Sequence, residues 1–287
     1  MEQFRQNQSK TMAIGIPYFN RPSEIRDVIK AAYENCPPWL EIKIFIVDEG
    51  STQKPGWDEL TNLGAYRIHL WVGPKNNGIG HARYVLGDIM VNAGPFDYYA
   101  FWDDDFLPAD GYFENIIDVL EGGQYKGMKV GMAGGYCHEL MKDWENVDYK
   151  NPFRMESHYE NSVIKHEIFM KIGNFDPRLW YYEDYDMVVR LEMLNMCFVM
   201  VPGANCIQDW RHPGGIQSNF GEQDREKLKG EMGRIFVEKY DGMIEMVTPP
   251  DWRPKIDWDE VRKAGDPLLY QDPDLRLNRF NTDLRYP

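Results

Sequence analysis

Apolar residues follow two different spacings along the first two thirds of the chain. Short apolar runs of strand length predict buried strands at Met12–Ile16, Ile42–Val47, Arg67–Val72, Tyr98–Trp102, Val130–Tyr136 and Phe198–Pro202. Helical spacing predicts helices at Ser23–Tyr33, from the Gly-containing loop Asn76–Arg83 to about Val91, at Tyr112–Leu120, from about Glu183, and at Glu222–Tyr240. Ser162–Phe175 predicts one more strand and a short helix that ends at Gly173. Strands that alternate with helices favour an α/β fold with a mainly parallel sheet.

Two segments lack a regular pattern. The polar stretch Cys137–Tyr159 is typical of a mobile flap or an acceptor-binding loop. The tail from Pro249 is rich in Pro, Asp, Arg and aromatic residues, and we expect little regular structure there. We therefore predict one domain over residues 1–240. Residues 241–287 then form an extended arm that packs on this domain or joins a partner subunit in a homo-oligomer.

Composition limits the class of protein. A hydrophobic fraction of 43% in 287 residues is enough for a sizeable core, so the chain is not intrinsically disordered. A formal net charge of -14 disfavours broad, non-specific binding to nucleic acid or anionic membrane. The four cysteines are scattered, which argues against structural zinc and favours free thiols. With a polar start and no apolar run of about 20 residues, we expect a soluble, cytoplasmic protein with no membrane partner.

The most informative stretch is the strand Tyr98–Trp102, which runs directly into Asp103, Asp104 and Asp105. Three adjacent carboxylates repel one another, and burial raises their pKa values. Either they lie in a solvated loop or a cation neutralises them, and this stretch alone leaves both open. Mg²⁺ and Mn²⁺ prefer carboxylate oxygens, so Asp103 and Asp105 are the first metal candidates. Asp48 also follows a predicted strand. Ligands gather at the carboxyl ends of parallel strands, so these acids indicate a nucleotide and a metal, unless they only cap the sheet.

A second acidic group opens the helix predicted near Glu183. Glu183 and Asp184 lie in its first turn, where the helix dipole favours the ionised form, and helix capping alone would explain them. The aromatic run that precedes them, Trp180 to Tyr182, is the kind of wall on which a sugar ring stacks. His212 follows in a turn-rich loop and, taken alone, is more typical of a surface or packing histidine.

Taken in order, six segments resemble the GT-A-fold glycosyltransferases, particularly the large family 2. They are IGIPYFNRP, VDEGST, NNGIGHAR, FWDDDFLP, GNFDPRLWYYEDYDMVVR and RHPGG, and they span about Ile14 to Gly215. No single segment is specific, but the ordered set is. The resemblance implies a Rossmann-like, mixed and mainly parallel sheet. It also implies a metal-dependent hexosyltransferase that moves a sugar from a nucleotide-sugar to an acceptor hydroxyl with inversion.

The resemblance also implies roles for particular residues. Pro17 and Asp48 would hold the base and ribose of the donor, and Arg83 would support its charge. Asp103 and Asp105 would hold Mn²⁺ or Mg²⁺ against the diphosphate, and His212 would be another metal ligand. Asp184 would be the catalytic base. The remaining candidates are Asp104 for the donor and Trp180, Tyr182 and Glu183 for the substrate.

Two departures from the family pattern leave details open. Three consecutive Asp make the register of the metal pair ambiguous, so Asp104 could replace one partner. Glu49 stands where the family more often has Asp or Asn, which blurs the preferred nucleobase, although UDP-sugars are the commoner donors. The acceptor stays open among a glycan, a protein, a small molecule and a modified DNA base.

Two other functions compete with sugar transfer. A nucleotidyltransferase that makes sugar nucleotides shares the sheet and the metal. The Gly-rich loop with its Arg, and the Lys that follows, are missing from Ile14–Arg26, so this function ranks below. The other alternative is a non-catalytic module that keeps the fold and binds carbohydrate.

Overall fold

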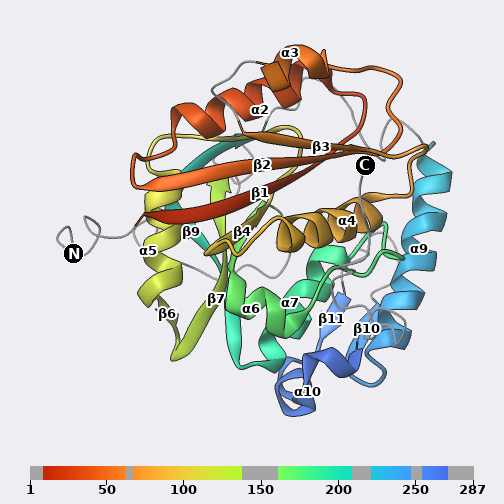
Figure 1. Ribbon diagram of the computed structural model, residues 1–287. Coiled ribbons are helices and arrows are strands. Elements are labelled where there is room, and N and C mark those ends of the chain that lie inside the picture. Colours follow the sequence, from red (N-terminus) through yellow and green to blue (C-terminus); the bar gives the residue numbers. More distant parts are fainter. Residues whose placement is uncertain (1–8, 63–66, 138–160, 209–220, 247–253, 271–287) are drawn as a thin grey trace.

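A computed structural model describes residues 9–62, 67–137, 161–208, 221–246 and 254–270 (Figure 1). The strands are β1 (Lys10–Tyr18), β2 (Leu40–Asp48), β3 (Ile68–Val72), β4 (Tyr98–Phe101), β5 (Phe106–Pro108), β6 (Gln124–Tyr125), β7 (Met128–Cys137), β8 (Ser162–Lys165), β9 (Met196–Gln208), β10 (Ile244–Met246) and β11 (Pro254–Ile256). The helices are α2 (Pro22–Glu34), α3 (Trp57–Asn62), α4 (Ile79–Asn92), α5 (Tyr112–Gly122), α6 (His166–Ile172), α7 (Glu183–Met193), α9 (Glu222–Lys239), α10 (Trp258–Ala264) and the 3₁₀ turn η1 (Pro267–Tyr270).

The main sheet has the strand order β3-β2-β1-β4-β8-β7-β9-β5, with β6 paired to β7. Strands β3, β2, β1 and β4 are parallel to one another, as are β7 and β9. Strand β8 lies antiparallel between β4 and β7, and β5 is antiparallel to β9. The predicted fold class, a mixed and mainly parallel sheet flanked by helices, is confirmed.

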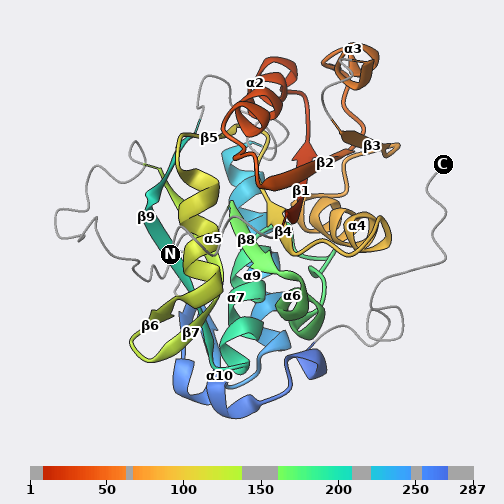
Figure 2. The same ribbon diagram turned by 60° about the vertical axis from the view of Figure 1, so that its left-hand side comes forward.

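Helices cover both faces of the sheet because successive strand side chains point to opposite sides. In β4, Tyr99 and Phe101 belong to the core shared with α4, α6 and α7, whereas Tyr98 and Ala100 belong to the core shared with α2 and α5. Figure 2 shows α2 and α5 on one side of the strands and α4 and α6 on the other. A strand buried on both faces needs apolar residues at nearly every position, which explains the continuous apolar runs in the sequence.

Two sequence predictions need correction. The strand predicted at Phe198–Pro202 is longer, because β9 continues to Gln208 through a stretch in which buried and exposed residues alternate. Apart from the exposed Ile207, the residues of that stretch are small or polar, so it is not an apolar run.

The tail also contains more regular structure than predicted. Asp257 caps α10 by accepting hydrogen bonds from the backbone of Asp259 and Glu260, and Val261 of α10 is fully buried. Arg262 donates to the buried carboxylate of Glu192 on α7 at 3.1 Å, so this part of the tail packs on the domain (Figure 1). An arm that joins a partner subunit stays a prediction, and residues 138–159 of the predicted flap lie outside the described residues. Among the described helices, none is long and apolar enough to cross a bilayer.

A buried ionic network fixes α7 against α9. Asp186 of α7 pairs with Arg190 at 2.8 Å and accepts from the hydroxyl of Tyr240 at 2.7 Å. Lys239 of α9 lies 2.6 Å from Asp186 and 3.1 Å from Asp176, which precedes α7. All five residues are nearly or fully buried, so the network joins α7 to the end of α9 inside the domain.

We predict that Asp176→Asn makes stability less dependent on acid pH. Burial alone would raise the pKa of Asp176, but hydrogen bonds from Arg178 and the charge of Lys239 outweigh it and hold the pKa well below its usual range. The ionised carboxylate therefore contributes stability above about pH 4, and this contribution is lost as the pH falls towards the folded-state pKa. Thermal unfolding midpoints between pH 2 and 6 should fall more steeply in the wild type than in the variant. The exposed Asp110→Asn should keep the wild-type slope; equal slopes for all three proteins would contradict the assignment.

Candidate active site

Three loops meet at the carboxyl edge of the parallel strands. Tyr18 at the end of β1 is in register with Asp48 at the end of β2, and Trp102, which follows β4, donates to the carbonyl of Gly15 at 3.0 Å. The backbone N–H of Phe19 then donates to Asp104 Oδ2 at 3.2 Å. The acids that follow β2 and β4 thus gather at one edge of the sheet, as the sequence predicted.

Asp104 and Asp105 are buried and share one arginine. Arg21 Nη1 lies 3.0 Å from Asp104 Oδ1 and also contacts Asp105 Oδ2, while Gln208 Nε2 donates to Asp105 Oδ1 at 3.3 Å. Burial raises the pKa of Asp104 to about 7 and that of Asp105 to about 6, and the charge of Arg21 offsets only part of this. The structure therefore excludes the solvated loop as the environment of these two acids.

Asp103 differs from its two neighbours because its side chain is 23% exposed. Its Oδ1 accepts from Arg83 Nη2 at 2.9 Å, and the same guanidinium donates through Nη1 to Glu183 Oε1 at 2.8 Å. Its backbone N–H donates to Asn161 Oδ1 at 2.7 Å. Arg83 is only 3% exposed, so it joins the end of β4 to the start of α7 through a rigid, two-sided contact.

Glu183 and Asp184 occupy different environments at the start of α7. Burial raises the pKa of Glu183 to about 7 although Arg83 opposes this. Asp184 is partly exposed, and its Oδ1 accepts from the N–H of Tyr185 at 2.8 Å. Burial also raises the pKa of Asp184, because it outweighs the charge of Arg83 and the backbone N–H groups at the start of the helix, which favour the ionised form. A partly exposed carboxylate with a raised pKa is suited to accept a proton.

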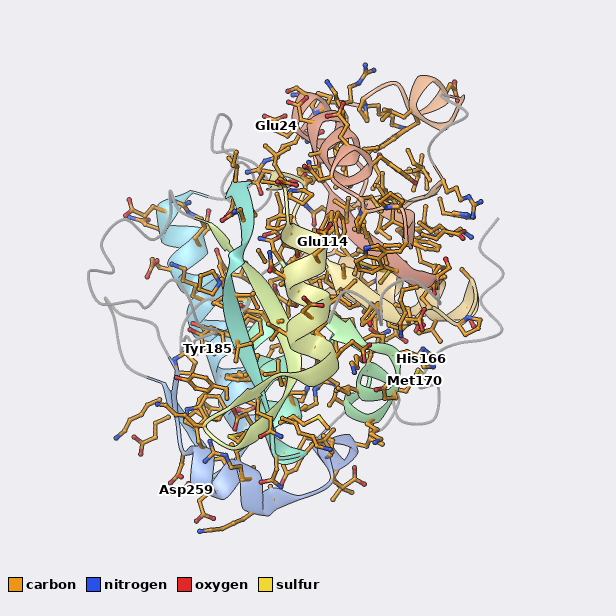
Figure 3. The ribbon with its side chains drawn as sticks, turned by 90° about the vertical axis from the view of Figure 1, so that its left-hand side faces the viewer. Glu24, Glu114, His166, Met170, Tyr185 and Asp259 are labelled. Atoms are coloured by element: carbon orange, nitrogen blue, oxygen red, sulfur yellow. The ribbon has the colours of Figure 1, made fainter. Side chains whose placement is uncertain are left out.

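The predicted aromatic wall is divided between core and surface. Tyr182 is 8% exposed and stacks on Phe236 of α9 at 5.8 Å, so its ring packs in the core and does not form an open surface for a sugar. Tyr185, labelled in Figure 3, packs edge-on against Tyr182 at 6.1 Å. Tyr182 has a φ of 68°, a left-handed conformation that is rare for tyrosine and that turns the chain into α7. Trp180 is partly exposed and remains the candidate for sugar stacking.

The nucleotide end of the site is formed by Asp48 and its neighbours. Asp48 is fully buried; its Oδ1 accepts from the N–H of Ser51 at 2.8 Å, and its Oδ2 has no hydrogen-bond partner among the described residues. A buried carboxylate oxygen without a donor is costly, so the position favours a ligand that brings an N–H group. Pro17 is buried beside it, in register with Val47.

Three residues of the site were not singled out as functional from the sequence. Arg21 is one, and the others are His81 and Asn77, which both bind Glu49. Glu49 accepts from the backbone N–H of Asn77 at 2.9 Å and lies 2.7 Å from His81 Nδ1. Glu49 therefore anchors the loop that leads into α4. In the sequence, Glu49 stood out only because the family more often has Asp or Asn at this position.

We predict that Gly78→Ala lowers stability by about 1–3 kcal/mol, the usual cost of a disfavoured backbone conformation. Gly78 has a φ of 97°, and a Cβ there would lie 2.3 Å from Cε2 of Trp180. The loop and the indole would have to separate, so donor affinity should fall with the thermal midpoint. Gly122→Ala is the matched control, because no atom lies within 4 Å of its Cβ. Equal midpoints and equal donor affinity in both variants would contradict the close contact of loop and indole.

The acidic cluster, Asp103 to Asp105, offers the ligand type of a hard divalent cation, because carboxylate oxygens are the ligands that Mg²⁺ and Mn²⁺ prefer. Asp103 is its most exposed member. His212, the predicted additional ligand, lies outside the described residues. Within the described ranges, no group of three or more His, Cys, Asp or Glu side chains has the arrangement of a metal site. The cation and the predicted roles of these residues therefore stay predictions.

Comparison with known proteins points to one family. The model of the family described as "Glycosyl transferase family 2" matches residues 13–176, more than half of the chain. No match was found among curated protein sequences.

Solved structures with the same fold hold nucleotides or nucleotide sugars. The mannosyltransferase PcManGT from Pyrobaculum calidifontis, in complex with GDP-Man and Mn²⁺, is 15% identical with a TM-score of 0.60, over 97% of this chain and 74% of that one. GalNAc-T7 with UDP, GalNAc and Mn²⁺ is 14% identical with a TM-score of 0.62, over 97% and 55%. TarS 1-349 from S. aureus in complex with UDP-GlcNAc is 11% identical with a TM-score of 0.57, over 95% and 79%. The predicted GT-A fold is thereby confirmed.

Proposed function

Because the chain belongs to glycosyl transferase family 2, we propose that it transfers a hexose from a nucleotide-sugar to an acceptor hydroxyl with the help of Mn²⁺ or Mg²⁺. The observation that carries this proposal is the two-sided contact of Arg83. Its guanidinium binds Asp103 at the end of β4 and Glu183 at the start of α7. It therefore brings the candidate donor acids and the candidate base, Asp184, to one place.

The donor is held at its nucleotide end by Asp48. The unpartnered Oδ2 accepts a ring N–H of the base, which both uracil and guanine possess. Two of the three structures named above hold UDP or a UDP-sugar, which favours a UDP donor over GDP. Asp103 is the partly exposed carboxylate that a divalent cation would reach. When bound, such a cation neutralises the charge that develops on the leaving diphosphate.

Asp184 accepts the proton of the acceptor hydroxyl as the new bond forms. A hydroxyl is a weak nucleophile at neutral pH, so a positioned carboxylate speeds its attack. Glu183 is held in an ion pair by Arg83, and it could accept the proton of the acceptor hydroxyl only if that ion pair broke. Direct attack on the anomeric carbon, opposite the leaving diphosphate, inverts its configuration. Trp180, beside the loop at Gly78, supports the sugar or the acceptor.

The proposal is tested by incubating the protein and Mn²⁺ with UDP-, GDP- and dTDP-sugars, with and without simple sugar acceptors. We expect one nucleotide family to release its nucleoside diphosphate, and release to be faster with an acceptor. Release of pyrophosphate from a sugar phosphate and a nucleoside triphosphate would instead indicate a nucleotidyltransferase. Binding of a nucleotide-sugar without release under any condition would support the non-catalytic module.

A further inference from the structure

Arg21 occupies an unusual place for a surface-loop arginine. It is the residue that precedes α2, yet its side chain is only 11% exposed and points into the acidic cluster. One nitrogen, Nη1, contacts a carboxylate oxygen of both Asp104 and Asp105. Two acids that burial drives towards the neutral form thus have a resident positive charge beside them.

All four carboxylate oxygens of these two acids have protein partners. In Asp104, Oδ1 binds Arg21 and Oδ2 accepts from the N–H of Phe19. In Asp105, Oδ2 binds Arg21 and Oδ1 accepts from Gln208. A cation that used either side chain would have to compete with these buried, charge-assisted contacts and would lie close to the positive charge of Arg21, which is unfavourable.

Asp103 is in a different situation. Its Oδ1 binds Arg83, but its Oδ2 has only Asn161 Nδ2 at 3.5 Å, beyond the usual range for an N–H···O hydrogen bond. Its side chain is also at least twice as exposed as that of Asp104 and far more exposed than that of Asp105, at 23% against 11% and 3%.

We propose that Arg21 is a built-in counter-cation that holds Asp104 and Asp105 in a buried ion pair and leaves Asp103 as the carboxylate that faces an incoming divalent cation. The inference rests on the proposed metal-assisted function and refines it. It resolves the ambiguous register of the three aspartates, since the pair Asp103 and Asp105 then no longer acts as two equivalent metal ligands. Arg21 is a positioning residue, because it acts through the carboxylates that it binds.

The test measures Mn²⁺ binding by electron paramagnetic resonance, with MnCl₂ as the probe and no nucleotide present. Asp103→Asn and Asp105→Asn each remove one negative charge, so a difference between them reports direct ligation. We expect Asp103→Asn to weaken binding at least about tenfold, within the range that metal-site partners contribute. Asp105→Asn should change binding less than about threefold, which is well below that range.

Arg21→Gln removes the counter-cation and exposes two more carboxylates to the metal. We expect it to tighten Mn²⁺ binding about tenfold, because a positive charge beside the metal site is removed, and MnCl₂ to raise its thermal midpoint more than that of the wild type. Arg26→Gln is the matched control, since Arg26 lies on α2, the helix that Arg21 precedes, and donates to the carbonyl of Pro55 at 2.7 Å. It should leave binding within about twofold of the wild type, because no partner of the metal-site acids is removed.

Three results would overturn the proposal. They are equal losses in Asp103→Asn and Asp105→Asn, weaker binding in Arg21→Gln, and absence of Mn²⁺ binding in both the wild type and Arg21→Gln. If Arg21→Gln does not fold, the two aspartate variants decide the question alone. The titration contains neither donor nor acceptor, so its outcome is independent of whether any nucleotide-sugar is turned over.

Discussion

Replacing Asp184 by Asn is expected to reduce sugar transfer by about 10²–10⁴-fold, the usual contribution of a general base. Asn keeps the shape of the side chain but cannot take the proton of the acceptor. In the proposed site the donor is held through Asp48 and the acidic cluster, so its affinity should stay within about twofold if no binding contact is lost. Steady-state kinetics and a separate donor-binding titration would measure the two effects.

The control for this variant is Asp224→Asn. Asp224 is also an acid in the first turn of a helix, α9, but it is exposed. Its replacement should leave turnover unchanged, which separates loss of the base from a general effect on helix ends. Asp184→Asn with wild-type turnover would remove Asp184 from the mechanism. A matching loss of donor affinity would place it in binding instead.

Replacing Arg190 by Met is expected to lower the free energy of unfolding by about 3–5 kcal/mol, the usual effect of breaking a buried ion pair. Arg190 is fully buried, pairs with Asp186, and donates to the backbone carbonyls of Ile172 and Gly173. Met fills similar volume but leaves these acceptors without their donor. For a chain of this size the thermal midpoint should fall by roughly 10 °C.

The matched control is Arg234→Met, which removes an arginine from a pair of the same spacing on α9. Arg234 and Glu238 are both more than 60% exposed, so this pair should contribute no more than about 1 kcal/mol. The comparison tests whether burial, and not the presence of an ion pair, makes the α7 network important. Similar midpoints for the two variants would contradict that explanation.

The features of the site that the sequence predicted correctly depend on local order along the chain. Asp48 and Asp103 each end an apolar run, and the carboxyl ends of parallel strands necessarily meet at one edge. Arg83 and Glu183 follow from ordered family segments. Their direct contact, at 2.8 Å across 100 residues of sequence, shows that these two segments lie next to each other in the fold.

The remaining features depend on contacts between distant residues, which no local pattern encodes. Arg21 looks like an ordinary loop arginine until β1 and β4 bring it beside Asp105. Tyr182 looks like an exposed aromatic next to acids, but Phe236 on α9 covers its ring. The helix α10 was missed for a different reason, which is local composition. Its cap at Asp257 lies in a stretch rich in proline and charged residues.

The most direct test of the proposed donor site is a thermal-shift screen of UDP-, GDP- and dTDP-sugars with and without Mn²⁺. Sugars of one nucleotide should raise the unfolding midpoint only when Mn²⁺ is present, and Asp48→Asn and Asp103→Asn should each abolish the rise. If no nucleotide-sugar stabilises the protein, or if the rise persists in both variants, these acids do not form a donor site.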